Sequence, residues 1–136
     1  MDRREARSRF ELARVARLGS VRPEGGPHLV PVVFAAAGET VYSVVDAKPK
    51  RSPHLQRLEN ARSEPRVSLL VDHYEEDWNA LWWVRADGLA VVQTEGPDRD
   101  RGIHLLAGKY PRYAERPPDG PALVIRVTRW RWWSAS

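Results

Sequence analysis

Three cations stand close together in residues 46–53, which read DAKPKRSP. They are Lys48, Lys50 and Arg51, and the Ser52-Pro53 pair that follows is typical of a helix start, with a hydroxyl N-cap and proline at the first helical position. A helix N-terminus presents unpaired N–H groups and the positive end of the helix dipole, so it favours an anion. The segment is therefore expected to bind a phosphate or carboxylate. A solvated loop with scattered charges is the alternative that the pattern leaves open.

Two apolar segments are expected beside this cationic segment. Residues 28–36 (HLVPVVFAA) and 40–46 (TVYSVVD) read as adjacent strands. Proline has no backbone N–H, so Pro31 marks a strand position that donates no hydrogen bond to a neighbouring strand. Backbone groups at 31–33 and 42–44 would then border an apolar surface on which a flat heteroaromatic ring could lie.

The Trp82-Trp83 pair could add stacking area to that surface. Packing in the core or in a subunit interface is the other interpretation of this pair, since large aromatic side chains are common in both.

Apolar periodicity predicts about six strands and three helices without regular βαβ alternation. Strands are expected at 18–21, 28–36, 40–46, 66–72, 80–94 and 122–135, and helices at 3–17, from Ser52-Pro53 through Ala61, and within 96–111. Gly88 would form a bulge or bend in the longest strand. Three helices are too few to cover both faces of a parallel sheet. The pattern therefore favours a mainly β (α+β) fold, an antiparallel barrel with peripheral helices.

Size and composition predict one domain spanning residues 1–136. The charged N-terminal segment resembles neither a secretory signal nor a membrane anchor, and no apolar run reaches the roughly 20 residues of a membrane helix. The chain has no cysteine, which excludes disulfides and thiolate chemistry. These features predict a cytoplasmic protein without membrane association. The net charge of +4 permits an anionic partner but does not identify one.

Two other segments suggest rival sites. The acidic loop 72–77 has metal-ligand types, but its ligands are crowded and no second cluster completes a coordination sphere, so no metal is expected. The ending TRWRWW (128–133) could bind single-stranded nucleic acid. Alternation, however, puts Trp130 and Trp132 on one face and the arginines 129 and 131 on the other, which argues instead for a dimer seam or core closure.

Several segments, in their order along the chain, resemble the sequences of a known family. HLVPVVF, VYSVVDAKPKRSPHLQRLENARSEPRVSLLVDHYEEDW and LWWVRADG are similar to the pyridoxamine-phosphate-oxidase-like split β-barrel family, the PPOX class of FMN-binding split barrels. Within it they resemble most closely the branch of probable enzymes dependent on coenzyme F420, a deazaflavin. The resemblance covers about residues 5–133.

This resemblance implies a six-stranded antiparallel split β-barrel that forms a homodimer with two cofactor sites at the interface. Cofactor binding would involve a hydroxyl near the ring, cations on the phosphate, strand backbone, and an aromatic residue of the second subunit. By position these are Pro31, Val32, Val33, Ser43, Lys48, Lys50, Arg51 and Trp83, with Trp82 and Arg85 as alternatives to Trp83. His28 and Val33 stand where the wider family commonly has basic residues, so we expect the longer-tailed deazaflavin rather than FMN.

The implied activity is hydride transfer from reduced coenzyme F420 to a small organic molecule, with the cofactor supplying the chemistry. The alternatives are an FMN-dependent oxidase or flavin reductase and a carrier without turnover. No catalytic residue is assigned, because the proton donor could be Tyr110, His28 or water. Lys109 and Tyr110 could line the opening beside the ring, or simply end a helix.

Overall fold

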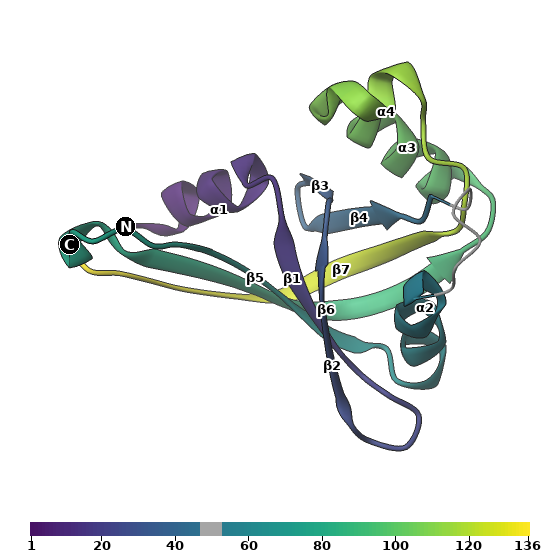
Figure 1. The fold of residues 1–136 in the computed structure, drawn as a ribbon, viewed down its shortest axis with the longest axis horizontal. Coiled ribbons are helices and arrows are strands. Elements are labelled where there is room, and N and C mark those ends of the chain that lie inside the picture. Colours follow the sequence, from purple (N-terminus) through teal and green to yellow (C-terminus); the bar gives the residue numbers. More distant parts are fainter. Residues whose placement is uncertain (47–52) are drawn as a thin grey trace.

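Seven strands form one antiparallel sheet, in the order β2-β1-β5-β6-β7-β4-β3 (Figure 1). The computed structural model describes residues 1–46 and 53–136, with side chains from residue 56 onward in the second range. The strands are β1 (Ala16–Val21), β2 (Pro27–Val32), β3 (Ala35–Ala37), β4 (Thr40–Val44), β5 (Arg66–His73), β6 (Trp82–Gln93) and β7 (Ala122–Ser134). The fold is mainly β, as expected, with seven strands rather than six in the described residues.

Alternation along the central strands separates a core face from an outer face. In β5, the side chains of Val67, Leu69 and Val71 are buried, whereas Arg66 and Asp72 on the opposite face are exposed. Successive side chains of a strand point to opposite sides, so this period of two gives the sheet one apolar face.

Four α-helices and one short 3-10 helix of the described residues surround the sheet. They are α1 (Arg3–Leu12), α2 (Pro53–Ser63), η1 (Trp78–Ala80), α3 (Pro97–Lys109) and α4 (Pro111–Glu115). The carboxylate of Asp2 caps α1 by accepting a hydrogen bond from the Glu5 N–H at 2.8 Å. In the described part of the chain, no helix combines the length and apolarity needed to cross a bilayer.

One side of helix α1 packs against the hydrophobic core. Ala6 and Phe10 are fully buried, and the Phe10 ring lies 5.1 Å from the rings of both Phe34 and Trp130. The expected helix 3–17 is too long, because the chain is already extended at Ala13 and enters β1 at Ala16.

The expected strand 28–36 is two strands, β2 and β3. Between them, the N–H of Phe34 donates to the Tyr110 hydroxyl at 3.1 Å, and its carbonyl oxygen accepts from Lys109 at 3.0 Å. Side chains of a remote segment thus take the place of a ladder partner at Phe34. The loop expected at 112–121 begins with helix α4, which has Pro111 in its first turn.

The predicted adjacency of residues 31–33 and 42–44 is wrong. Strand β2 pairs with β1, whereas β4 pairs with β3 and β7, at the other end of the sheet. Strand β3 takes the place beside β4 through the tight Gly38-Glu39 turn, where Gly38 has a φ of 61°. In the described chain, the edge strands β2 and β3 follow each other without a ladder between them.

The β6–β7 ladder is irregular at Gly88, where a bulge or bend was predicted, but the extra residue lies on the partner strand β7. Asp87 pairs with Arg129 and Gly88 with Val127, so Thr128 is the extra residue on β7. A Cβ on Gly88 would lie 2.4 Å from the carbonyl oxygen of Arg126, closer than side-chain carbons approach. The position therefore requires glycine.

Candidate functional site

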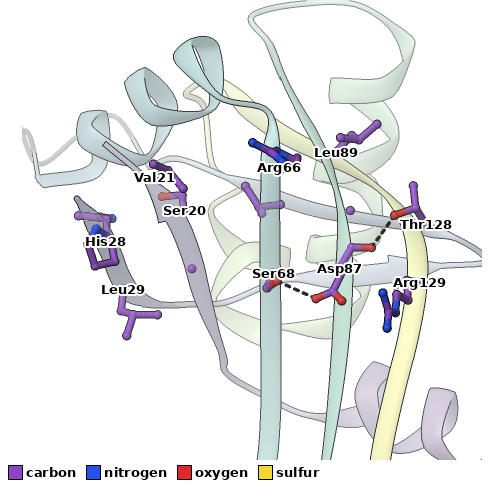
Figure 2. Close-up of a pocket in the computed structure, with 14 residues that line it drawn as sticks. Ser20, Val21, His28, Leu29, Arg66, Ser68, Asp87, Leu89, Thr128 and Arg129 are labelled. Carbon is purple, nitrogen blue, oxygen red and sulfur yellow. Dashed lines mark hydrogen bonds between the residues drawn. The ribbon is translucent and has the colours of Figure 1, made fainter. Parts of the chain in front are cut away.

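A broad pocket of about 630 Å³ opens on the outer face of the sheet, across β2, β1, β5, β6 and β7 (Figure 2). Gly19 lies in its floor and has no side chain to interrupt it. Leu29, which is 74% exposed, and Leu89 are among the apolar side chains of the lining. This flat, mainly apolar surface with a few polar groups has the character of a small-molecule site.

Polar groups gather where β5 and β6 meet in the pocket. The Ser68 hydroxyl donates to Oδ1 of Asp87 at 2.7 Å, and Nε of Arg85 donates to the same oxygen at 3.0 Å. The Thr128 hydroxyl donates to the backbone carbonyl of Asp87 at 3.3 Å. Figure 2 shows Ser68 and Thr128 on either side of Asp87, with Arg129 beside it. The group can fix the orientation of a polar ligand edge.

His28 lies in the part of the pocket formed by β1 and β2 (Figure 2). Burial lowers its pKa, and the positive charges of Arg22 and Arg57 add to this effect. Its Nδ1 atom is buried and has no hydrogen-bond partner among the described residues. The imidazole is therefore neutral at physiological pH and can offer one nitrogen to a ligand.

Helix α2 is attached to the pocket strand β1 by a buried polar chain. Nε2 of Gln56 donates to Oδ1 of Asn60 at 2.8 Å, and Nδ2 of Asn60 donates to Oγ of Ser20 at 3.0 Å. Asn60 is fully buried, so these bonds satisfy amide groups that water cannot reach. The chain holds α2, the helix that follows the cationic segment, in a defined position beside the pocket.

Comparison with family models decides what kind of protein carries this pocket. The model described as pyridoxamine 5'-phosphate oxidase matches residues 3–134. The chain belongs to the pyridoxamine 5'-phosphate oxidase family. The family predicted from the sequence is thus confirmed. A comparison with curated proteins found no match.

Solved structures of the same fold are similar over almost the whole chain. A conserved hypothetical protein of Mycobacterium tuberculosis has a TM-score of 0.78 and 23% identity, covering 99% of this chain and 86% of that chain. A heme binding protein of Mycobacterium smegmatis has a TM-score of 0.75 and 22% identity, and the match covers 95% of this chain and 52% of that chain. A FAD-binding protein of Mesorhizobium loti has a TM-score of 0.69 and 20% identity, and the match covers 97% of this chain and 92% of that chain. At these identities the similarity shows a shared fold.

The structure distributes the sequence-predicted residues of this family member over several elements. Pro31 and Val32 belong to β2 and Val33 follows it, Ser43 is buried on β4, and Trp83 lies on the outer face of β6. None of these described residues lines the 630 Å³ pocket; Trp83 instead borders a second cavity. Lys48, Lys50 and Arg51 lie outside the described residues.

Sequence reasoning missed the polar group of the pocket. Alternation along 66–72 and 80–94 does place Ser68 and Asp87 on the non-core side of their strands. The register that brings the two together depends on pairing between β5 and β6, which alternation does not specify.

Lys109 and Tyr110 connect separate parts of the chain. The Tyr110 hydroxyl lies 2.9 Å from the carbonyl oxygen of Arg14 and 3.0 Å from that of Phe34. Burial raises the pKa of Tyr110, which keeps the phenol protonated at physiological pH. The pair joins the α3–α4 junction to the segment before β1 and to the β2–β3 junction.

The acidic loop after β5 makes local contacts. His73 pairs with Glu75 through Nε2 and its ring stacks on Trp82, with centroids 6.0 Å apart. Within residues 1–46 and 53–136, no group of three or more His, Asp or Glu side chains is arranged to hold a metal ion.

Proposed function

We propose that this family member binds a flavin-type cofactor, specifically the deazaflavin coenzyme F420, on the outer face of its sheet and acts as an oxidoreductase. The observation that carries the proposal is the 630 Å³ pocket, whose glycine floor and apolar walls suit a planar ring system. Membership of an oxidase family and the FAD-binding protein of the same fold support it.

Each part of the site has a role in this proposal. Gly19 and the group around Asp87 would hold the ring, the glycine as an open floor and the polar group at its polar edge. The cationic residues Lys48, Lys50 and Arg51, which precede in sequence the helix that Asn60 fixes to β1, would hold the anionic tail. Residues 31–33 and Trp83 lie outside this pocket and would complete the site from a second subunit, whereas Ser43 is buried on β4 and would act only through its backbone. The bound cofactor would supply hydride, while the protein orients it and excludes water.

We also propose a homodimer with sites at the interface. The outer face exposes large apolar side chains: Leu29 at 74%, Val91 at 53% and Trp133 at 46%. Exposed apolar residues on one sheet face mark an interaction surface, and a second copy would cover them symmetrically.

A haem carrier is the second candidate. The neutral imidazole of His28 lines the pocket, and a neutral imidazole is a haem ligand. The heme binding protein from Mycobacterium smegmatis shares the fold.

Parallel titrations of the purified apo-protein with coenzyme F420, FMN and hemin test the proposal. Coenzyme F420 is expected to bind most tightly, and its reduced form should then be oxidised in the presence of an acceptor such as a quinone. Tighter binding of FMN would indicate a flavin oxidase or reductase instead. A Soret band that disappears on His28→Ala, without F420 binding, would establish the haem carrier.

A further inference from the structure

One row of paired residues crosses four strands of the sheet in the 630 Å³ pocket. Gly19 of β1 stands opposite Ser68 of β5. Ser68 in turn stands opposite Asp87 of β6, and Asp87 opposite Arg129 of β7 (Figure 2). Neighbouring strands lie about 4.8 Å apart, so Asp87 is roughly 10 Å from the glycine floor. The row therefore runs from an open apolar surface to a group of charged side chains.

The carboxylate of Asp87 is held through one of its two oxygens. The Ser68 hydroxyl donates to Oδ1 at 2.7 Å, and Nε of Arg85 donates to the same oxygen at 3.0 Å. Among the residues that the structure describes, no hydrogen bond reaches Oδ2, and the side chain is 27% exposed. An ionised carboxylate accepts at both oxygens, so Oδ2 remains an acceptor for a donor in the pocket.

The bulge in β7 places a donor beside this carboxylate. Thr128 is the extra residue, and the side chains of Thr128 and Arg129 are both exposed although they follow each other along the strand. Bulges re-aim side chains in this way and are frequent next to active sites. Arg129 stands directly opposite Asp87, yet the two form no ion pair within the described part of the chain. An acceptor and a donor thus lie side by side in the pocket.

The glycine at the other end of the row is not required by packing. A Cβ on Gly19 would lie 3.4 Å from the side chain of Leu29 and 3.8 Å from the carbonyl oxygen of Ser68, which are ordinary van der Waals distances. The backbone of Gly19 does not have a positive φ either. The absent side chain instead leaves room over β1 for the body of a flat ligand whose edge reaches Asp87.

We infer that Asp87 and Arg129 together recognise the edge of a cyclic imide, in which a ring N–H lies next to a ring carbonyl. Oδ2 of Asp87 would accept from the N–H, and the guanidinium of Arg129 would donate to the carbonyl oxygen. Charged partners make such bonds roughly twice as strong as bonds between neutral groups. The inference rests on the proposed function, because the pyrimidine ring of a flavin or deazaflavin carries this edge. Haem carries no imide, so the pair is a determinant of cofactor specificity.

Fluorescence titration of the apo-protein with 5-deazariboflavin and its N3-methyl derivative tests the pair. Methylation removes the ring N–H and should weaken binding to the wild type roughly tenfold. In Asp87→Ala, 5-deazariboflavin should bind roughly tenfold more weakly, and the two compounds should differ less than twofold. Arg129→Gln changes an exposed residue and should weaken both compounds roughly tenfold while preserving their ratio. The matched control is Arg131→Gln, an exposed residue of β7 outside the pocket lining, which should change neither affinity more than twofold.

Equal binding of the two compounds by the wild type would overturn the inference, and this comparison needs no variant. A ratio that persists in a folded Asp87→Ala protein, or equal losses in Arg129→Gln and Arg131→Gln, would do the same. Titration with coenzyme F420 separates the two proposals. If the coenzyme binds but 5-deazariboflavin does not, recognition lies in the tail and only the inference fails. If neither binds, the proposed function fails and the inference with it.

Discussion

The ammonium group of Lys109 donates a hydrogen bond to the carbonyl oxygen of Phe34 at 3.0 Å and lies 3.9 Å from the centroid of the Phe34 ring. This contact joins the end of α3 to the β2–β3 junction. Burial, with a further contribution from Arg14, lowers the pKa of Lys109 from 10.5 to about 8. The charged form is therefore less favoured in the folded protein than in the unfolded chain.

The pKa of Lys109 predicts a pH-dependent contribution to stability. Between pH 8 and pH 10.5 the unfolded chain binds more protons at this residue, so the free energy of unfolding should rise with pH across that window. Urea unfolding of the wild type and of Lys109→Met at pH 7.5 and pH 10 measures the effect. The wild type should gain stability relative to the variant at the higher pH. Arg101→Met, an exposed change on α3, should show no such relative gain. A pH-independent difference for Lys109→Met would refute the assignment.

Tyr110→Phe should destabilise the protein. Its hydroxyl accepts from the Phe34 N–H at 3.1 Å and can donate to the carbonyl oxygen of Arg14 or Phe34. Removing it leaves a part-buried N–H without its partner, at an expected cost of about 1–3 kcal/mol in the free energy of unfolding. Denaturant unfolding measures this, and Tyr74→Phe, at a residue 61% exposed, should stay within about 0.5 kcal/mol. Equal effects in both variants would contradict the role of the Tyr110 hydroxyl.

Gly88→Ala and Gly108→Ala should act in opposite directions. A Cβ at Gly88 would meet backbone of β7 at 2.4 Å, so the bulge must distort, and we expect a loss of more than about 2 kcal/mol. A Cβ at Gly108 meets nothing within 4 Å, and alanine there should stabilise α3 by about 0.5–1 kcal/mol. Thermal unfolding of both variants distinguishes them. A tolerated Gly88→Ala would show that the bulge does not require glycine.

Lys50→Ala should weaken cofactor binding without unfolding the protein. The sequence places this cation immediately before a helix that begins at Pro53, where an anionic tail would bind. Loss of one charge-assisted contact should raise the dissociation constant for coenzyme F420 roughly tenfold. Arg101→Ala, which removes an exposed cation from α3, serves as the control. An unchanged dissociation constant in a folded Lys50→Ala protein would remove the residue from the proposed site.

Local sequence patterns predicted much of the secondary structure. The strand at 122–135 and the start of the helix at Pro53 were located to within a residue, because alternation and proline placement are properties of neighbouring residues. The glycine at position 88 marked the site of the irregularity for a similar reason, although the extra residue proved to be Thr128 on the partner strand. Family membership also followed from residue order, and the family match over residues 3–134 confirms it.

Contacts between distant segments decided the rest. Phe34 lies in an apolar run that reads as one strand, yet its backbone bonds to Tyr110, which is 76 residues away, and the strand divides there. Strand β2 pairs with β1 rather than with β4, its expected neighbour, because β3 forms the hairpin with β4. The composition of 28–46 contains no information about these partners.

By itself, then, the sequence determined where most of the strands and helices lie, which side chains of the strands share a face, and which family the chain belongs to. Tertiary structure alone decided that Ser68 meets Asp87 and that Trp83 stands opposite Trp133. The physical reason is that alternation assigns a side chain to one face of a strand, whereas its neighbour on that face depends on the register of another strand. Both cavities of the outer face are built from such neighbours.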